Sequence, residues 1–279
     1  MFERILYPTD FSEVSLHALR KCIPELFSLG AKKLYLVHVV DITVVEFEAF
    51  ELEEIYRKKL GEIARELKDE GLDVAPIVRL GIPSVEIAEM AESEKVDLIV
   101  IPNLGESLWR VAFVGSTATN LARATKKPIL ILKYHTTGED RFELPFKCAE
   151  IFKRPLVAVD FSKCSVKILS AVKQFEELVE DGLLVHSVDY GKVEELEHNI
   201  QIARQNLEKS IRGIKGPFKY EVLVGTASQA IIGTATVRRS TLVVIGKKGR
   251  SFITDLLLGS TAERIIRDSN FPVLLVPCG

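Results

Sequence analysis

Apolar residues fall into short runs of four to six residues that alternate with longer amphipathic stretches along the whole chain. The runs are rich in Val, Ile and Leu and show little alternation with polar residues, which is typical of strands buried on both faces of a parallel sheet. We expect five strands in each half of the chain, at 3–8, 33–39, 74–79, 97–102, 128–133, 154–159, 182–188, 219–224, 241–246 and 272–277.

The amphipathic stretches between these runs carry apolar residues at helical spacing. We expect helices over 47–69, 84–92, 193–212 and 229–238, one that begins at Ser12, and a last helix in each half that begins at a Gly-Ser-Thr-Ala segment. Strands that alternate with helices predict an α/β fold, in which a parallel sheet has helices on both faces and right-handed connections.

The second half of the chain repeats the first at a spacing near 145 residues. YPTDFSEVS at 7–15 corresponds to VAVDFSKCS at 157–165, and VGSTA at 114–118 corresponds to LGSTA at 258–262. Four further pairs of similar segments occur, and the order of all six is the same in both halves. We therefore interpret the chain as a duplication.

The duplication predicts two tandem, doubly wound, Rossmann-like domains, each with a five-stranded parallel sheet. We expect domain 1 over 1–135 and domain 2 over 151–279. Residues 136–150 contain Gly, Pro and several charges without apolar periodicity, so they are the expected linker.

Charge differs between the two halves. The chain is formally −2, but residues 1–139 carry −5 and residues 140–279 carry +3. Such mild charge lacks the broad basic face of a nucleic-acid binder. No apolar run approaches the ~20 residues of a membrane helix, and the N-terminal MFERILYPTD has charge and proline where a signal peptide has an apolar core. We therefore expect a cytoplasmic protein with neither a nucleic-acid nor a membrane partner.

The four cysteines, Cys22, Cys148, Cys164 and Cys278, are widely scattered and include no C-x-x-C pair. This pattern excludes zinc ribbons and thioredoxin-type redox motifs. We interpret all four as apolar residues of the interior. His38 and His186 are repeat equivalents near the end of the second strand, and we interpret both as structural.

Strand-to-helix turns are the candidate site, because open parallel sheets bind ligands beyond the carboxyl ends of their strands. Asp160 follows the first strand of the second repeat and can accept hydrogen bonds from a ribose or a base. The segment 246–250, Gly-Lys-Lys-Gly-Arg, joins positive charge to backbone that a phosphate can approach closely. Gly259-Ser260-Thr261 adds hydroxyls and backbone donors at a helix start. Taken singly, a helix cap or a plain surface turn explains each of these features as well.

Together the turns read Gly246-x2-Gly249-x9-Gly259-Ser260-Thr261, with Asp160 after the first strand. This arrangement resembles the nucleotide-binding members of the universal stress protein family, and the resemblance covers both repeats. It implies an adenine nucleotide alpha hydrolase-like fold that binds ATP or AMP, with Mg²⁺ at the phosphates.

The resemblance also implies a role for each site residue. Asp160 would meet the ribose or adenine side, and the backbone of Ser187 would meet the adenine edge. The ribose and phosphates would lie against the remaining site residues, which are Gly246, Lys247, Gly249, Arg250, Gly259, Ser260 and Thr261.

The first repeat departs from this pattern. Its weaker candidate site comprises Asp10, Val39, Gly105, Gly115, Ser116 and Thr117. Pro102 replaces the first glycine, and proline has no N–H and a fixed φ. Glu106 stands where the second repeat has Arg250, so an anion replaces a cation beside the phosphates. We expect the nucleotide to bind mainly in the second domain.

The leading functional hypothesis is a nucleotide-binding regulatory module of the stress response. A slow ATPase and a nucleotide-free scaffold for protein partners are the alternatives. The sequence has no P-loop, dinucleotide-type glycine motif or nucleophile elbow, and no clear general base beside the phosphates, so we expect at most weak ATP hydrolysis.

The expected partners are an adenine nucleotide and a protein that the sequence does not identify. The last strands of family members commonly pair across a dimer. Here 129–133 and 273–277 would pair within one chain as a pseudo-dimer, which protects an exposed edge. The helix faces could support a further homodimer.

Overall fold

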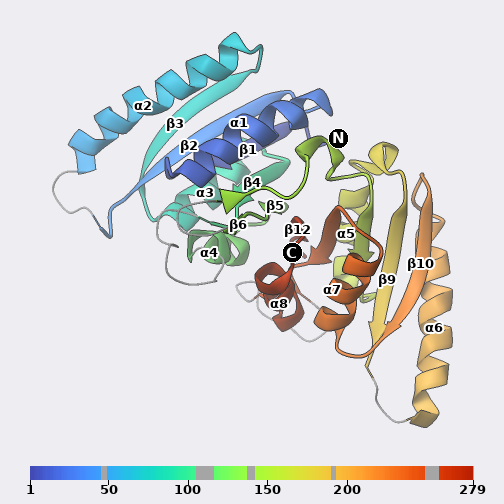
Figure 1. The fold of residues 1–279 in the computed structure, drawn as a ribbon. Helices are drawn as coiled ribbons and strands as arrows, with labels where there is room; N and C mark the ends of the chain where they lie inside the picture. The colour runs from blue at the N-terminus through green and yellow to red at the C-terminus, as the bar shows by residue number, and fades with distance from the viewer. Residues whose placement is uncertain (45–48, 105–115, 137–141, 190–192, 249–257, 279) are drawn as a thin grey trace. The chain divides into compact units, whose positions relative to one another are not determined.

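The computed structural model describes residues 1–44, 49–104, 116–136, 142–189, 193–248 and 258–278. The chain divides into two compact units, Met1–Ala149 (unit 1) and Glu150–Gly279 (unit 2). Each unit contains one set of parallel strands with helices packed against it (Figure 1).

Unit 1 contains the strands β1 (Arg4–Pro8), β2 (Lys33–Asp41), β3 (Val74–Gly81), β4 (Leu98–Pro102) and β5 (Ile129–Leu132). They pair in parallel in the order β3-β2-β1-β4-β5. Its helices are α1 (Glu13–Ser28), α2 (Ala49–Asp69), α3 (Pro83–Ser93) and α4 (Ser116–Ala124).

Unit 2 repeats this arrangement with β8 (Pro155–Ala158), β9 (Gly182–Val188), β10 (Phe218–Val224), β11 (Leu242–Gly246) and β12 (Val273–Val276). They pair in parallel in the order β10-β9-β8-β11-β12. Its helices are α5 (Lys163–Val172), α6 (Val193–Ile211), α7 (Ala227–Val237) and α8 (Ser260–Asp268), and a short 3₁₀ turn, η3, covers Glu176–Leu178.

This architecture confirms the expected α/β fold class and its duplication, and the strand ends lie within two residues of the predicted ones. The apolar runs form the interior: all four residues of β5 and all four of β12 are buried. Such burial on both faces accounts for the lack of polar alternation in the sequence.

The strand order of each unit reverses direction once. The chain moves from β1 outward to β2 and β3, then returns to β4 on the other side of β1. With right-handed connections, the helices before and after this reversal cover opposite faces. Contacts between α3 and α4, and between α7 and α8, agree with that division. The reversal lies between β1 and β4 in unit 1 and between β8 and β11 in unit 2, and open α/β sheets bind ligands beyond the strand ends at such a point.

The expected linker, 136–150, belongs to unit 1 up to Ala149 in the contact division. It contributes to a short antiparallel pair, β6 (His135–Thr136) with β7 (Phe142–Glu143), and to the 3₁₀ turn η2 (Cys148–Glu150). The backbone N–H of Ala149 donates to the Glu25 carboxylate of α1 at 2.6 Å. These contacts attach the segment to the unit that precedes it.

The cysteines correct the sequence interpretation. They are buried or partly buried as expected, but the structure joins them in two disulfides, Cys22–Cys148 in unit 1 and Cys164–Cys278 in unit 2. The partners lie 126 and 114 residues apart in sequence. Only the folded chain brings such distant positions together, so the absence of a C-x-x-C motif does not exclude disulfide bonds between them.

None of the helices in the described part of the chain is long and apolar enough to cross a membrane.

Candidate functional site

The turn after β8 holds the first candidate residue, Asp160. Phe161 adopts a positive φ of 60°, which turns the chain sharply into α5. The Oδ1 atom of Asp160 accepts hydrogen bonds from the Ser162 N–H at 3.0 Å and from the Ser162 hydroxyl at 2.6 Å. Ser162 in turn caps α5 by accepting from the N–H of Cys164. The turn therefore fixes one carboxylate oxygen at the carboxyl end of the sheet.

Unit 1 builds nearly the same turn around Asp10. Phe11 has the same φ of 60°, and Asp10 Oδ1 accepts from the Ser12 N–H and hydroxyl at 3.0 and 2.6 Å. Ser12 caps α1 by accepting from the N–H of Ser15. The sequence repeat thus becomes a repeat of backbone geometry.

One substitution makes the two turns differ. In unit 2 the Ser165 hydroxyl donates to Asp160 Oδ1 at 3.0 Å, so this oxygen accepts three hydrogen bonds. In unit 1 the equivalent Ser15 hydroxyl donates instead to the Thr9 hydroxyl at 3.0 Å. Thr9 corresponds to Val159, which has no hydroxyl to compete. Asp160 is accordingly half-buried and held by its helix, whereas Asp10 is exposed.

A cavity of about 180 Å³ lies in unit 2. Six of the residues that the sequence assigned to the nucleotide line it, namely Asp160, Ser187, Gly246, Gly259, Ser260 and Thr261. Apolar side chains, among them Ile168, Ile231 and Ile245, form much of the remaining wall, together with His186 and Lys248. The sequence motif therefore converges on one cavity from four different elements.

The end of β9 forms one side of this cavity. The last register pair of β8 with β9 is Ala158 with Val185, so β9 runs past β8 at His186 and Ser187. The Ser187 hydroxyl donates to the carbonyl of Gly225 at 2.9 Å, which ties it to the end of β10. Its side chain is thus engaged within the sheet, and the residue lines the cavity.

The sequence analysis interprets His186 as structural, and the structure shows one defined hydrogen bond for its ring. Its Nδ1 lies 2.7 Å from the carbonyl oxygen of Val159. Because a carbonyl only accepts, Nδ1 must carry the hydrogen. The ring also packs against Phe161 with centroids 4.4 Å apart and borders the cavity. Its repeat equivalence to His38 was the available signal, but that signal did not reveal the cavity.

The segment after β11 brings the glycine-rich residues together. The Lys247 N–H donates to Val276 at 2.7 Å, and the Lys247 carbonyl accepts from the Gly259 N–H at 2.9 Å. These two bonds hold Gly259 beside the strand end although it lies 12 residues further along the chain. Lys247 is only 5% exposed, and Lys248, rather than Lys247, lines the cavity.

The start of α8 faces the same cavity. Its N-cap is Gly259, so no cap side chain accepts from the N–H groups of the first turn. Ser260 and Thr261 are exposed at this end. A helix start with available backbone donors and two hydroxyls has the chemistry of an anion site.

Some predicted site residues lie outside the described residues, namely Gly249 and Arg250 in unit 2 and Gly105 and Gly115 in unit 1. Ser116 and Thr117 begin α4, but their side chains are likewise not described. Glu106 also falls in this part of the chain.

The described residues of unit 1 are packed differently from those of unit 2. Pro102 ends β4 where Gly246 ends β11, and Val39 lies within β2 opposite Arg79. Tyr56 of α2 packs its ring on His38 and on Phe11, with centroids 4.3 and 5.4 Å away. His38 is consequently 8% exposed, although its equivalent His186 borders a cavity.

Comparison with known proteins gives a consistent family. The sequence profile of the universal stress protein family matches residues 1–133 and 152–277. A universal stress protein of Methanocaldococcus jannaschii is 33% identical over 156 residues, which cover 48% of this chain and 96% of the relative. One from Mycolicibacterium smegmatis is 24% identical over 294 residues and covers 98% of this chain and 96% of the relative.

A solved structure shows the same fold. The crystal structure of a universal stress protein from Archaeoglobus fulgidus has a TM-score of 0.74 at 23% identity. The match covers 99% of this chain and 98% of that chain. At such identity the likeness concerns the fold alone, and it extends over both repeats.

Proposed function

The chain belongs to the universal stress protein family, and from this premise we propose that unit 2 binds an adenine nucleotide, ATP or AMP, as a regulatory module of the stress response. The observation that carries the proposal is the cavity of unit 2. It gathers Asp160, Ser187, Gly246 and the start of α8, which are far apart in sequence. Such convergence of separate motif residues supports a ligand site at the topological reversal of the sheet.

The nucleoside would occupy the part of the cavity between Asp160 and Ile231. Apolar side chains there suit the faces of a base, and the main chain at Ser187 suits its polar edge. The held carboxylate of Asp160 can accept hydrogen bonds from ribose hydroxyls. The volume of about 180 Å³ is smaller than the ~300–1,000 Å³ typical of pockets for drug-sized ligands. It suits the nucleoside better than a whole nucleotide.

The phosphates would extend toward Gly259, Ser260 and Thr261. Backbone donors at the start of α8 attract negative charge, and the two hydroxyls add donors. Lys248 borders the same cavity and contributes a positive charge. The net +3 of residues 140–279 agrees with an anionic ligand in this half of the chain.

The described residues fit a magnesium ion only as a companion of ATP. No group of three or more His, Cys, Asp or Glu side chains that could hold a metal occurs among them. Mg²⁺ commonly relies on phosphate oxygens and water with few protein ligands. The hydroxyl groups of Ser260 and Thr261, at the start of α8, could serve as protein ligands of a Mg²⁺ ion bound to the phosphates.

Unit 1 is proposed to bind nucleotide weakly or not at all. Pro102 removes a backbone N–H at the position of Gly246. Tyr56 packs on the ring of His38, and the Ser15 hydroxyl bonds Thr9 where the equivalent Ser165 hydroxyl bonds Asp160. Each difference reduces either the space or the preorganisation of the site.

Titration calorimetry with ATP, AMP and GTP tests the proposal. Saturable binding of an adenine nucleotide that GTP does not match supports it, and the absence of binding by all three contradicts it. Phosphate release measured on the same samples separates a binding module from the alternative of a slow ATPase.

Replacing Ser165 by alanine should weaken ATP binding by about threefold to tenfold. The change removes one of the three donors that hold Asp160 Oδ1, and a hydrogen bond contributes roughly 0.5–1.5 kcal/mol. Ser15→Ala is the matched control, because its hydroxyl bonds Thr9 rather than Asp10. Equal effects of the two substitutions on ATP affinity would contradict the assignment of the site to unit 2.

A further inference from the structure

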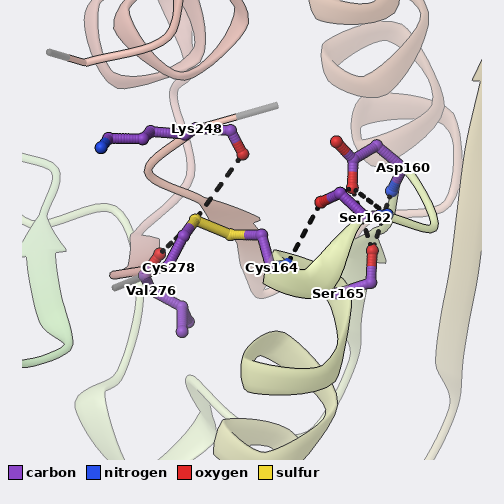
Figure 2. Close-up of a disulfide and its surroundings, with 7 residues drawn as sticks. All are labelled: Asp160, Ser162, Cys164, Ser165, Lys248, Val276 and Cys278. Atoms are coloured by element: carbon purple, nitrogen blue, oxygen red, sulfur yellow. Dashed lines mark hydrogen bonds between the residues drawn. A yellow bond between two sulfur atoms is a disulfide. The ribbon is translucent and has the colours of Figure 1, made fainter. Parts of the chain in front are cut away.

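The disulfide of unit 2 lies against the candidate site. Cys164 is the second residue of α5, in the turn that Ser162 caps and Asp160 begins. Cys278 follows β12, two residues after Val276. Figure 2 shows the bond spanning from this turn to the chain end, with Lys248 above it.

Both sulfur atoms contact the segment from Gly246 to Lys248. A Cβ atom placed on Gly246 would lie 2.6 Å from the Sγ of Cys164, so only a glycine allows this approach. The Sγ of Cys278 lies 3.7 Å from the carbonyl oxygen of Lys248 (Figure 2). Gly246 and Lys248 both line the cavity, so the disulfide directly supports part of its wall.

Unit 1 has no disulfide at the equivalent place. The repeat aligns Cys164 with Val14 and Cys278 with Tyr134. Val14 and Tyr134 are buried, and Tyr134 bonds Asn103 through two hydrogen bonds of 2.7 and 3.2 Å. The cross-link at the strand ends therefore occurs beside the cavity of unit 2 and not at the equivalent place of unit 1.

The position of Cys164 favours thiol–disulfide exchange. A thiolate in the first turn of α5 would be stabilised by the helix N-terminus, and a stabilised thiolate is a good leaving group. Cys164 is 4% exposed, whereas Cys278 is partly exposed near the chain end. An incoming thiolate therefore reaches the sulfur of Cys278 more easily and displaces Cys164.

We propose that Cys164–Cys278 is a site of thiol–disulfide exchange, and that its oxidation state sets the nucleotide affinity of unit 2. The reductant is a dithiol. Its first thiolate attacks the Sγ of Cys278 and forms a mixed disulfide as Cys164 leaves. Its second thiolate then releases Cys278. The dithiol is oxidised to its disulfide, and the protein gains two electrons and two protons as two thiols.

Reduction changes the support of the cavity wall. Two thiols cannot stay at bonding distance, so the sulfur atoms separate to van der Waals contact beneath Gly246. The Cys278 thiol also gains a hydrogen that it can donate to Lys248, which a disulfide sulfur lacks. Both changes displace the segment that lines the site. The effect on affinity rests on the proposed function, and by linkage bound nucleotide must in turn alter how readily the bond is reduced.

The experiment uses the variant Cys22→Ser/Cys148→Ser, in which only the unit 2 disulfide remains. ATP affinity is measured in the oxidised protein, after reduction with dithiothreitol, and after reoxidation, with thiols counted at each stage. We expect affinity to fall about fivefold or more on reduction and to recover on reoxidation. Cys164→Ser/Cys278→Ser in the otherwise natural chain should match the reduced form, and it replaces the first variant if that one does not fold.

The outcomes separate this inference from the proposed function. Equal affinity in both states, or a bond that dithiothreitol does not open, overturns the inference and leaves nucleotide binding intact. If neither ATP nor AMP binds in either state, the proposed function fails, and hydrogen exchange of the amides from Gly246 to Lys248 then decides. Faster exchange on reduction supports redox control of the wall, and unchanged exchange overturns it.

Discussion

Replacing Asp160 by alanine should weaken ATP binding by about 10- to 100-fold, whereas Asp10→Ala should leave it unchanged. A hydrogen bond to a charged group contributes roughly 1.5–3 kcal/mol, and Asp160 lines the cavity of unit 2. Asp10 sits in an almost identical turn but in the unit where Tyr56 covers His38. The two variants therefore remove the same carboxylate from equivalent turns, of which only the one in unit 2 is expected to bind nucleotide.

Alanine at 160 also removes the acceptor of three hydrogen bonds within the turn. Asp160→Asn separates the two effects, since it keeps an oxygen acceptor in the turn while it removes the charge. We expect the Asp160→Asn variant to bind ATP more weakly than the natural protein but to unfold at a similar temperature. Loss of ATP binding in Asp10→Ala with retention in Asp160→Ala would reverse the assignment of the two units.

Gly246→Ala should destabilise unit 2 by roughly 1–3 kcal/mol and weaken nucleotide binding with it. The new Cβ would lie 2.6 Å from Cys164 Sγ and 3.2 Å from the Lys248 carbonyl oxygen, and the disulfide prevents the sulfur from turning away. Urea denaturation followed by circular dichroism measures the change in the free energy of unfolding.

Two further variants identify the cause. Gly233→Ala is the matched control, because nothing lies within 4 Å of its Cβ position on α7 and alanine favours a helix. In a Cys164→Ala background the cost of Gly246→Ala should shrink, because the clashing sulfur is gone. An undiminished cost in that background would show that contact with the disulfide does not explain the glycine.

The layout of the fold was predictable because its interior strands are unusually uniform. The apolar runs that form β4 and β11 are almost entirely buried. The sequence repeat places these two runs at corresponding positions of the two units. The hydrogen-bonded turn after the first strand of each unit was predictable because its residues occur in both repeats. Asp10 and Asp160 recur before a capping serine, and both copies fold into the same hydrogen-bonded turn.

The rest of the site depends on distances that a sequence does not contain. Gly246 was assigned to phosphate contact, but the structure adds a second reason for it, which is the sulfur of Cys164. Ser165 recurs as Ser15 in the repeat, but only the exchange of Thr9 for Val159 decides which oxygen its hydroxyl bonds. A motif comparison covers only the matched residues. Cys164 and the Thr9/Val159 pair lie outside the motif, so their effect on the site appears only in the structure.

The number of ATP molecules bound per chain at saturation tests the central claim most directly. Calorimetric titration of the intact, oxidised protein gives this number without any substitution. The asymmetry between the units predicts one site per chain in the working concentration range, and Asp160→Ala should remove it. Two sites of equal affinity, or a single site that depends on Asp10, would contradict the account.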